Sequence, residues 1–451
     1  MMNKKVLIAG CGMSGIQAAN LLTSCGEEVV MYDGNVSLSE AELREKLDRP
    51  CRIVLGELPE DVIAETSYCI ISPGISLEVP FVRALSEAGI EIRSEIEAAW
   101  LFEKGTVIGI TGTNGKTTTT TLVGDIMKAF LGEEKAFTAG NIGIPYAKEV
   151  QKTSEGSVTT IELSSFQLET IRAFRPHVSA ILNITPDHLN RHHTMECYAS
   201  VKERVTMNQT EEDFCVLNAD DARLYAFGTS GIRPKVVWFS GTRELRDGYF
   251  LQGDTLYSAK NGEKKALLRT DEVNLVGQCN YENILAAIAV TEAMQVPEEI
   301  ILETCRNFKA VPHRIEYVRT VNGVRYYNDS KGTNPDAAIQ GVKAMTSPTV
   351  LIGGGYDKGS TYDEWIESFD GKIKELILMG VTAEKIAACA REHGFHEIVF
   401  VNSMEEAVRE AADKALPGEA VLLSPACASW GMFKNYEQRG DIFKDLVNQL
   451  S

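Results

Sequence analysis

The sequence predicts an α/β protein with three domains in series, and three observations lead to this prediction. The chain has 451 residues, which corresponds to about three domains at roughly 150 residues each. Short apolar runs of strand length alternate with helical patterns along the whole chain. Two glycine-rich loops, at 10–15 and 111–117, each follow a predicted strand and open a predicted helix.

The first hundred residues predict a Rossmann-like domain, which we place at residues 1–102. Strands are predicted at 4–9 and 28–32, with a helix at 16–24 between them, and these make one βαβ unit. Further strands, each beside a helical pattern, are predicted at 52–55, 68–71 and 90–92.

The central part of the chain predicts a P-loop ATPase-like domain at residues 103–312. A strand at 106–110 leads into the second glycine loop and a helix at 116–131. Residues 236–270 alternate between apolar and polar and carry Gly-Asp and Asn-Gly turns, which predicts a small antiparallel patch. The other elements predicted here are strands at 157–163 and 178–184 and a helix at 280–294.

The last part predicts a second Rossmann-like domain, which we place at residues 313–451. It opens with a hairpin-like stretch at 311–327. Strands separated by helical patterns follow at 349–352, 375–379, 398–401 and 420–423. We find no internal repeat and no long linker between the three predicted domains.

Composition and charge exclude several classes of protein. The chain is 44% hydrophobic and 24% charged, which is ordinary for a globular protein and wrong for a disordered one. It has 45 basic and 63 acidic residues, a net charge of −18, so we expect no nucleic-acid partner. No apolar run approaches the ~20 residues of a membrane helix, and the N-terminal apolar run is too short for a signal peptide. We therefore expect no membrane insertion and a cytoplasmic protein.

The ten cysteines do not follow a metal or redox pattern. No two of them form a C-x-x-C pair, so the spacing indicates neither a zinc ribbon nor a redox couple. We expect reduced, buried thiols, as in an intracellular protein.

The first glycine loop, G-C-G-M-S-G at 10–15, matches G-x-G-x-x-G, and Asp33 follows about 20 residues later. Glycines at these positions let backbone N–H groups approach a pyrophosphate at a helix N-terminus. A single match leaves two interpretations open. The loop either binds a dinucleotide or is a turn that only lets strand and helix pack.

The second loop, T-G-T-N-G-K-T at 111–117, carries a more specific signal. Backbone amides would cradle phosphates, Lys116 would reach the β- and γ-oxygens, and the Thr117 hydroxyl would bind Mg²⁺. The loop departs from G-x-x-x-x-G-K-[ST], because Ile110 occupies the first glycine position. Strand, loop and helix are nevertheless all in place, so we expect phosphate binding here.

Two further groups lie at the ends of predicted strands. Glu162 is either a magnesium ligand beside the P-loop or an acid favoured by a helix N-terminus, and position alone does not decide.

Asp187 and His188 follow the next strand, with His192 and His193 close by. Their spacing fits no usual zinc motif, so magnesium chemistry or exposed loop histidines are the alternatives.

Taken together, these motifs resemble the ATP-dependent Mur ligases, and the resemblance covers essentially the whole chain. The glycine loop at 10–15, the E-L-S-S-F-Q-L segment and the S-P-A-C-A-S segment resemble the branch of that family that adds D-glutamate. The matching segments are 111–117, 140–143, 162–168, 183–188, G-x-x-N-x-x-N at 277–283, 312–314, 328–331 and 424–440.

The resemblance implies that the first domain holds the UDP part of a sugar nucleotide rather than a redox cofactor. The residues that occupy the family's positions for this substrate are Met13, Ser14, Asp33, Gly34, Gly74, Asn141 and His188. It also implies an ATP site formed by Gly112, Thr113, Asn114, Gly115, Lys116, Thr117, Thr118, Asn280, Asn283, Arg314 and Asp329. Arg314 and Asp329 begin the third domain, so domain closure is expected as part of the cycle.

The resemblance implies two Mg²⁺ ions and a modified lysine. Thr117 and Glu162 match ligands of the first ion and His188 matches a ligand of the second. Lys202 matches a lysine that the family carries as a carbamate, whose anionic oxygens suit Mg²⁺ where an ammonium would repel it. The implied catalytic residues are Lys116, Asn141, Glu162, His188 and Lys202. His192 and His193 gain no such support.

The substrates implied by the resemblance are UDP-N-acetylmuramoyl-L-alanine and D-glutamate, joined through an acyl phosphate formed with ATP. Tyr436 stands where the family pattern has Phe, and its hydroxyl could donate to a carboxylate or to water. The D-glutamate positions are Lys331, Thr333, Lys358, Ser429 and Tyr436.

Three other functions compete with this one. A folylpolyglutamate-synthase-like ligase would lack the first domain, and a nicotinamide-dependent oxidoreductase would leave the P-loop idle. A catalytically dead regulator would not keep every expected ligand. We therefore expect a ligase of peptidoglycan precursor synthesis, and we expect it to be a monomer.

Overall fold

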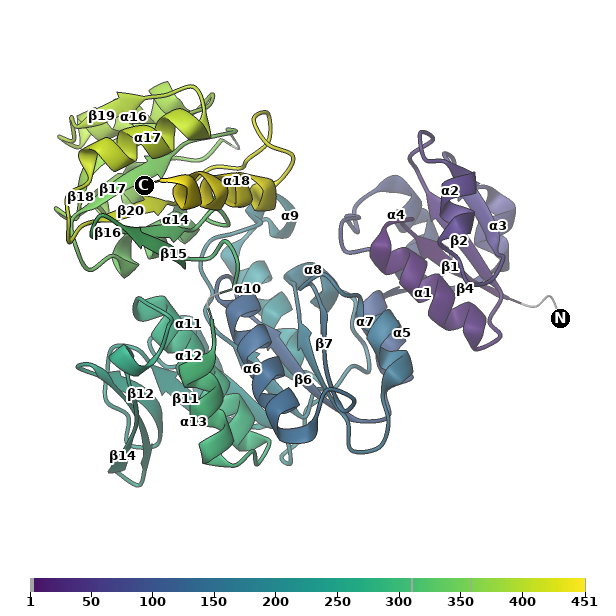
Figure 1. The fold of residues 1–451 in the computed structure, drawn as a ribbon. Coiled ribbons are helices and arrows are strands. Elements are labelled where there is room, and N and C mark those ends of the chain that lie inside the picture. Colours follow the sequence, from purple (N-terminus) through teal and green to yellow (C-terminus); the bar gives the residue numbers. More distant parts are fainter. Residues whose placement is uncertain (1–3, 310, 358, 451) are drawn as a thin grey trace. The chain divides into compact units, whose positions relative to one another are not determined.

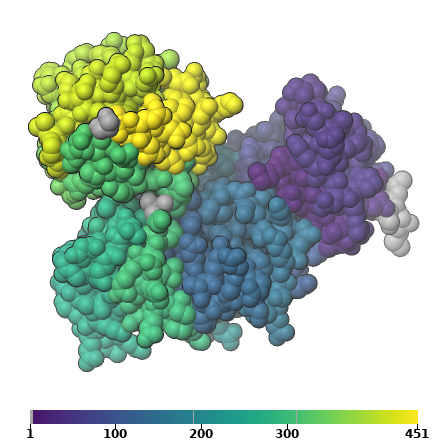
Figure 2. All heavy atoms as spheres, viewed as in Figure 1, coloured from purple at the N-terminus to yellow at the C-terminus, as the bar shows by residue number. Residues whose placement is uncertain are grey.

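The computed structural model describes residues 4–309, 311–357 and 359–450. Three separate sheets, of five, nine and six strands, follow one another along the chain, which confirms the predicted α/β architecture (Figure 1). The colours of Figure 2 fall into contiguous blocks, so residues close in sequence stay together in space. The chain divides into two compact units: the first contains the first sheet and most of the second, and the second contains the third sheet.

The first sheet has the strand order β3-β2-β1-β4-β5, and all its pairings are parallel. One core cluster packs α1 and α2 against the sheet and another packs α3 and α4 against it, so both faces are covered. From β1 the chain adds strands β2 and β3 on one side of the sheet, and it then adds β4 and β5 on the other side. The boundary between β1 and β4 is therefore the topological switch point, where open α/β sheets bind ligands. The elements are β1 (Lys5–Ala9), α1 (Met13–Ser24), β2 (Val29–Asp33), α2 (Glu40–Glu45), β3 (Arg52–Leu55), α3 (Glu60–Glu65), β4 (Thr66–Ile71), α4 (Pro80–Glu87), β5 (Glu91–Ser94) and α5 (Glu95–Trp100).

The second sheet has the order β14-β13-β12-β11-β10-β9-β6-β8-β7, and β6 lies between β8 and β9 in parallel pairings. The carboxyl ends of β7, β8, β6 and β9 therefore meet at one edge. The elements that build this edge are β6 (Thr106–Thr111), α6 (Lys116–Leu131), β7 (Ala136–Gly140), α7 (Tyr146–Glu149), η1 (Val150–Lys152), β8 (Val158–Glu162), α8 (Ser165–Leu168), β9 (Val178–Ile181), α9 (Leu189–His192), α10 (Met195–Glu203) and η2 (Arg204–Thr206).

The patch predicted at 236–270 is an extension of the second sheet. Strand β11 joins it through parallel pairing with β10 and with β12, which the prediction of a purely antiparallel patch missed. Strands β12, β13 and β14 are neighbours joined by two-residue turns, and such turns join antiparallel strands. The elements are β10 (Phe214–Asn218), α11 (Ala222–Thr229), β11 (Lys235–Ser240), β12 (Gly248–Gln252), β13 (Thr255–Lys260), β14 (Glu263–Arg269), η3 (Thr270–Glu272), α12 (Gln278–Ala293) and α13 (Glu298–Asn307).

The third sheet has the order β15-β16-β20-β17-β18-β19 and opens with the predicted hairpin. Alternate residues of β17 enter different cores: Leu351 packs with α14, α15 and α16, whereas Val350 and Ile352 pack with α17 and α18. The elements are β15 (Glu316–Val321), β16 (Val324–Asn328), α14 (Pro335–Ala344), β17 (Thr349–Gly353), α15 (Asp363–Glu367), β18 (Ile373–Leu378), α16 (Ala383–Glu392), β19 (Ile398–Phe400), α17 (Met404–Lys414), β20 (Ala420–Leu423) and α18 (Tyr436–Gln449).

Two further expectations are tested here. No helix in the described part of the chain is both long and apolar enough to cross a membrane. The prediction of buried thiols is wrong for half of the cysteines. All ten are free, but Cys25 and Cys197 are exposed and Cys51, Cys279 and Cys389 are partly exposed.

Candidate functional site

The first glycine loop lies at the switch point of the first sheet. The Asp33 carboxylate at the end of β2 accepts the Cys11 N–H at 2.9 Å and the Asn35 N–H at 3.0 Å, which fixes two loops at the same edge. A Cβ on Gly15 would lie 1.9 Å from the Gly10 oxygen, so close packing of strand and helix requires glycine there. Among the predicted UDP contacts, the Met13 side chain is 61% exposed and Gly34 and Gly74 are exposed.

The second glycine loop joins β6 to α6, as predicted. Its backbone is held by the loop after β9: Asn114 N–H donates to Asn183 Oδ1 at 2.8 Å, and Asn183 Nδ2 donates to the Asn114 carbonyl at 3.1 Å. The Thr113 hydroxyl donates to the Thr185 carbonyl at 3.1 Å and accepts the Thr185 N–H at 3.0 Å. These bonds hold the loop in place at the N-terminus of α6, where backbone N–H groups favour an anion.

The residue before α6 makes the closest approach in this loop. Gly115 has φ +85°, and a Cβ there would lie 2.2 Å from Asn283 Oδ1. Asn283 on α12 also accepts the Thr119 hydroxyl at 3.3 Å. The Thr118 hydroxyl is buried without a hydrogen-bond partner among the described atoms. Asn283 and Thr118, both predicted for ATP, therefore lie at the start of α6.

Two lysines converge on one carbonyl oxygen. The Gly112 oxygen accepts from Lys116 Nζ at 2.8 Å and from Lys202 Nζ at 2.7 Å, and Lys116 also donates to the Thr113 carbonyl. Lys202 on α10 is only 1% exposed. Burial, together with the charge of Lys116, holds the pKa of Lys202 well below its ordinary value. Its amine is therefore neutral far more readily than that of a surface lysine.

Glu162 ends β8, next to the P-loop strand, and is 2% exposed. Its Oε1 accepts from Asn141 Nδ2 at 2.8 Å, while its Oε2 is buried without a hydrogen-bond partner in the described structure. A buried carboxylate oxygen left unpaired is costly unless a cation or another donor meets it. The donor set fits a hard, oxygen-preferring cation such as Mg²⁺.

His188 lies just before α9 with φ +53°, an uncommon conformation for a residue other than glycine. Its Nε2 lies 3.4 Å from Asp187 Oδ2, and its ring meets Phe166 edge-on with centroids 4.8 Å apart. Roughly half of the side chain is exposed. The ring is thus oriented on two sides and reachable from solvent.

The neighbouring histidines have other partners. His192 is 2% exposed, contacts the Ser165 hydroxyl at 2.9 Å, and burial lowers its pKa to about 4. His193 lies 3.1 Å from Glu78 at the surface. The three histidines therefore have separate partners in the described structure.

The second unit contains the remaining predicted ATP residues. Asp329 follows β16 and is 4% exposed, accepting the Ser424 hydroxyl at 2.7 Å and the Ile315 N–H at 3.2 Å. Burial raises the pKa of Asp329 to about 7. Arg314 Nε is buried without a hydrogen-bond partner among the described atoms. Asn280 Nδ2 donates to the Val276 carbonyl at 2.8 Å.

Four of the five predicted D-glutamate residues follow β16 or β20 in the chain, and these are neighbouring parallel strands. Lys331 Nζ lies 5.6 Å from the centroid of the Tyr436 ring. Thr333 N–H donates to the Lys331 carbonyl at 2.8 Å, and Ser429 is 4% exposed. Lys358 lies outside the described residues.

Sequence reasoning missed Arg439, which braces this region from α18. The side chain is 1% exposed, and its guanidinium donates to Ser330 Oγ at 2.9 Å, to the Ser330 carbonyl at 2.7 Å and to the Cys427 carbonyl at 3.1 Å. Burial lowers the pKa of Arg439 to about 10. No pattern around Arg439 separates it from a surface arginine, so only the tertiary structure identifies it.

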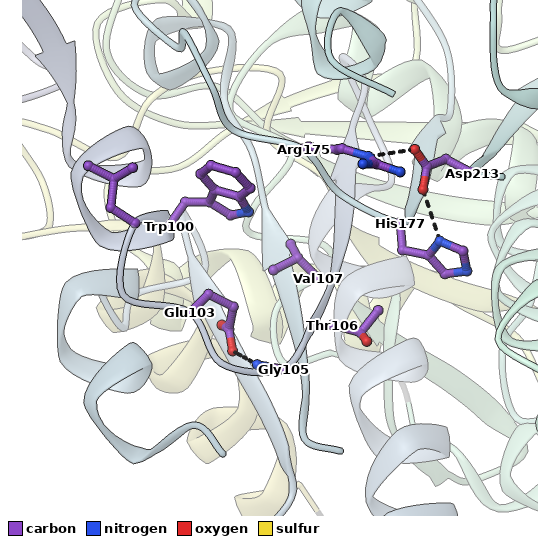
Figure 3. A pocket seen from close by; sticks show the side chains of 9 residues that line it. Trp100, Glu103, Gly105, Thr106, Val107, Arg175, His177 and Asp213 are labelled. Carbon is purple, nitrogen blue, oxygen red and sulfur yellow. Dashed lines mark hydrogen bonds and ion pairs between the residues drawn. The ribbon is translucent and has the colours of Figure 1, made fainter. Parts of the chain in front are cut away.

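A cavity of about 560 Å³ lies elsewhere in the first unit (Figure 3). In it, Asp213 pairs with Arg175 at 2.8 Å and with His177 at 3.0 Å. Its lining includes Thr106, the first residue of β6, so it opens at the amino ends of the strands. It therefore lies at the opposite edge of the sheet from the P-loop and is separate from the candidate site.

Models of known protein families match the segments of the chain that form the three sheets. Family models match residues 4–94 (Mur ligase MurD-like, N-terminal domain), 110–291 (Mur ligase middle domain) and 313–427 (Mur ligase, glutamate ligase domain). A protein of Lachnospira eligens named UDP-N-acetylmuramoylalanine–D-glutamate ligase is 52% identical over 449 residues, 99% of each chain. The chain belongs to the Mur ligase family. A protein of the same name from Lachnoclostridium phytofermentans is 50% identical over 100% of this chain and 99% of that one.

The fold agrees with this membership. The crystal structure of the MurF ligase of Thermotoga maritima in complex with ADP superposes with a TM-score of 0.59 over 99% of both chains, at 14% identity. Membership in the Mur ligase family confirms the resemblance stated from the motifs, and with it a ligase and the use of ATP. It leaves no role for the nicotinamide-dependent alternative. The roles of individual residues and the three domain boundaries stay predictions.

Proposed function

We propose that this chain is an ATP-dependent ligase that adds D-glutamate to UDP-N-acetylmuramoyl-L-alanine in the cytoplasm, during peptidoglycan precursor synthesis. The observation that carries the chemistry is the buried Glu162 carboxylate, with one unpaired oxygen, at the same sheet edge as the P-loop. The printed names of the full-length relatives supply the two substrates.

The reaction first brings together two anions, the substrate carboxylate and the γ-phosphate of ATP, and then forms the carbon–nitrogen bond. An oxygen of the substrate's terminal carboxylate attacks the γ-phosphorus of ATP, and ADP leaves. The amine of D-glutamate then attacks the acyl carbon, loses a proton, and the tetrahedral intermediate expels phosphate to give the amide. Most of the catalytic work is neutralising negative charge, as in other phosphoryl transfers. Lys116, positioned by the Gly112 and Thr113 carbonyls, supports this role.

Thr117, Glu162 and His188 would hold Mg²⁺ ions at this edge of the sheet. The unpaired Glu162 oxygen and the oriented His188 ring support this assignment. Bound Mg²⁺ would supply positive charge to the phosphate oxygens. Asn141 keeps the other Glu162 oxygen occupied, so it would set the direction of the carboxylate.

Lys202 would act as a carbamate. Carbamylation requires a neutral amine that attacks carbon dioxide and loses a proton, and the burial that lowers the pKa of Lys202 favours the neutral form. The product would place an anion near the positively charged Lys116, since both side chains meet at the Gly112 carbonyl. The charge of Lys116 therefore supports the modification.

The UDP group and D-glutamate would bind at the strand ends of the first and third sheets. The switch point of the first sheet, with Met13, Ser14, Asp33, Gly34 and Gly74, would take the UDP group. Lys331, Thr333, Lys358, Ser429 and Tyr436 would take D-glutamate, whose two carboxylates need cations and hydroxyl donors.

The test is phosphate release from ATP and Mg²⁺ in bicarbonate buffer with UDP-N-acetylmuramoyl-L-alanine, with D- or L-glutamate supplied in parallel. The proposal predicts release with D-glutamate alone and a nucleotide heavier by one glutamate residue. Release with L-glutamate only would support a different amino-acid specificity. Release with neither isomer would refute the substrate assignment.

A further inference from the structure

Two helices of the second unit bring three side chains that can bind a metal together, and a fourth, Glu367, lies next to one of them. Asp363 and Glu367 are four residues apart on or at the ends of α15, and Cys389 and His393 are four apart at the C-terminal end of α16. Residues spaced in this way lie on one face of a helix. Ligand atoms of Asp363, Cys389 and His393 all lie within 4.8 Å of one another.

The distances suit one shared ion. His393 Nε2 lies 3.5 Å from Glu367 Oε1 and 3.8 Å from Asp363 Oδ1. Ligands of a tetrahedral zinc ion, with metal–ligand distances of about 2.0–2.3 Å, are separated by about 3.3–3.8 Å. Cys389 Sγ lies 3.9 Å from His393 Nδ1, so the thiol would turn toward Nε2, and the Glu367 carboxylate toward the other ligands, for the four side chains to share an ion.

The histidine tautomer also favours a metal. His393 Nδ1 lies 2.9 Å from the Cys389 carbonyl oxygen, which can only accept, so Nδ1 carries the hydrogen. In the neutral ring this leaves the lone pair on Nε2, the nitrogen that faces both carboxylates. A backbone carbonyl that fixes the outer nitrogen is the usual support of a metal-bound histidine.

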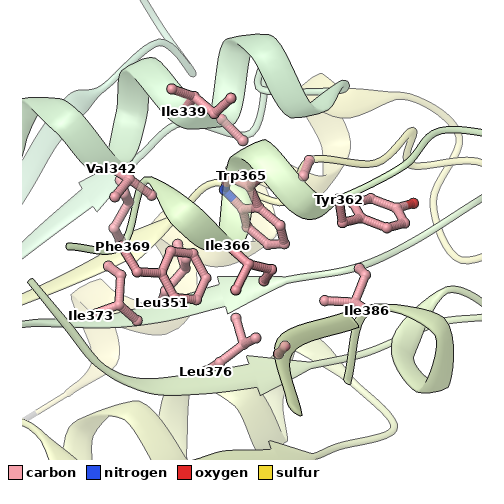
Figure 4. Close-up of a cluster of buried hydrophobic side chains, with 14 of the residues drawn as sticks. Ile339, Val342, Leu351, Tyr362, Trp365, Ile366, Phe369, Ile373, Leu376 and Ile386 are labelled. Atoms are coloured by element: carbon pink, nitrogen blue, oxygen red, sulfur yellow. The ribbon is translucent and has the colours of Figure 1, made fainter. Parts of the chain in front are cut away.

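The helices beneath the cluster are held firmly. Trp365 and Ile366 of α15 and Ile386 of α16 enter the same buried core (Figure 4). The Phe369 ring packs edge-on against Trp365 at 5.5 Å and against Phe395 at 5.2 Å. The four side chains thus project from well-packed helices and reach solvent: His393 is 25% exposed, Glu367 is 65% exposed and Cys389 is partly exposed.

We propose that Asp363, Glu367, Cys389 and His393 form a surface site for one divalent transition-metal ion of the zinc class. A thiolate, an imidazole nitrogen and two carboxylates match the ligand preferences of Zn²⁺ and differ from the all-oxygen sets that Mg²⁺ takes. The bound ion would link α15 to α16 and stabilise the second unit. None of these four residues is among those proposed for the ligase chemistry.

The test uses Co²⁺ as a probe on the full-length protein with saturating Mg²⁺. We expect one equivalent to bind with the near-ultraviolet absorption of a cobalt–thiolate bond, and Zn²⁺ to displace it. Cys389→Ser should remove this absorption, and His393→Gln should weaken binding at least about 10-fold. Cys197→Ser, at an exposed cysteine outside the cluster, is the control and should bind like the wild type.

A thermal shift provides the second readout. Zn²⁺ should raise the Tm of the wild type and of Cys197→Ser but not that of Cys389→Ser, because binding to the folded state alone stabilises it. Absence of the thiolate absorption in the wild type, or its persistence in Cys389→Ser, would overturn the proposal. His393 would then be only a helix-end cation paired with two carboxylates.

Discussion

At the scale of single residues, the candidate site is a balance of buried charges. Lys116 and Lys202 both donate to the Gly112 carbonyl, while the Glu162 carboxylate has an unpaired oxygen at the same sheet edge. Lys202 and Glu162 are buried, and each is costly to bury alone. Bound phosphates and metal cations would supply the opposite charges that these groups need.

Lys202→Arg should reduce kcat by roughly 100-fold while the protein stays folded. A guanidinium keeps its positive charge and cannot form a carbamate, so it would leave a cation where the proposal needs an anion. Steady-state phosphate release measures the effect. Lys128→Arg, on the partly exposed part of α6, is the control and should retain full activity; equal activity of both variants would contradict the role of Lys202.

Asp329→Asn should stabilise the second unit above pH 7. Burial raises the pKa of Asp329 to about 7, so between pH ~4 and ~7 the folded state holds a proton that the unfolded state has lost, and stability falls as pH rises. The shift corresponds to at most ~4 kcal/mol. Because the variant weakens the bond from Ser424, we expect a net gain of ~1–3 kcal/mol at pH 8.

Urea unfolding at pH 8 and pH 5 measures this gain. The difference between variant and wild type should shrink at pH 5, where the wild-type carboxyl is itself largely protonated. A difference that does not change with pH would contradict the assigned charge state. Ligase activity should fall in the variant. A buried charge that lowers the stability of a binding site is typically kept because the activity needs it.

At the scale of elements, the site is made by strand ends. Parallel strands β7, β8, β6 and β9 bring Asn141, Glu162, the P-loop and Asn183 to one edge. The P-loop itself is fixed by glycines whose backbone no other residue can adopt without strain.

Gly115→Ala should weaken ATP binding at least about 10-fold and lower stability by more than the ~1–2 kcal/mol of a positive φ alone. Its Cβ would lie 2.2 Å from Asn283 Oδ1. Gly156→Ala is the matched control, because Gly156 has φ +77° with only the Lys135 Nζ within 4 Å, at 3.9 Å. Calorimetric titration with a non-hydrolysable ATP analogue and urea unfolding compare the two. Equal costs for both variants would show that the contact with Asn283 is unimportant.

Most elements were predictable because their signals are local. The strands at 52–55 and 420–423 and the helix at 116–131 match the structure residue for residue, since periodicity and flanking glycines define them. The parallel pairing of β11 with β12 was not predictable, because the apolar–polar alternation that indicates a strand does not give the direction of its neighbour. Lys202 and Arg439 read as surface residues in the sequence, and only packing shows them buried.

At the scale of the whole molecule, each of the three sheets in series offers a different type of binding site. The first sheet offers a nucleotide-type switch point, the second a phosphate loop and the third a strand edge with polar and cationic residues. The net charge of the chain is −18 and the three proposed substrates are anions, so local cations rather than the overall field would attract them.

We predict a monomer of 49.5 kDa in solution. The most exposed large apolar side chains in the described regions, such as Val36, Val381 and Leu416, belong to separate segments, whereas obligate dimers bury large continuous apolar surfaces. Light scattering coupled to size-exclusion chromatography at two concentrations measures the mass. A mass twice as large that persists on dilution would contradict the prediction.

The most direct test of the central claim follows oxygen through the reaction. UDP-N-acetylmuramoyl-L-alanine labelled with ¹⁸O in its terminal carboxylate is incubated with ATP, Mg²⁺ and D-glutamate, and the released phosphate is analysed by mass spectrometry. An acyl phosphate predicts one ¹⁸O transferred to each phosphate, because the oxygen that attacks the γ-phosphorus leaves with it. Unlabelled phosphate accompanying amide formation would contradict the proposed chemistry.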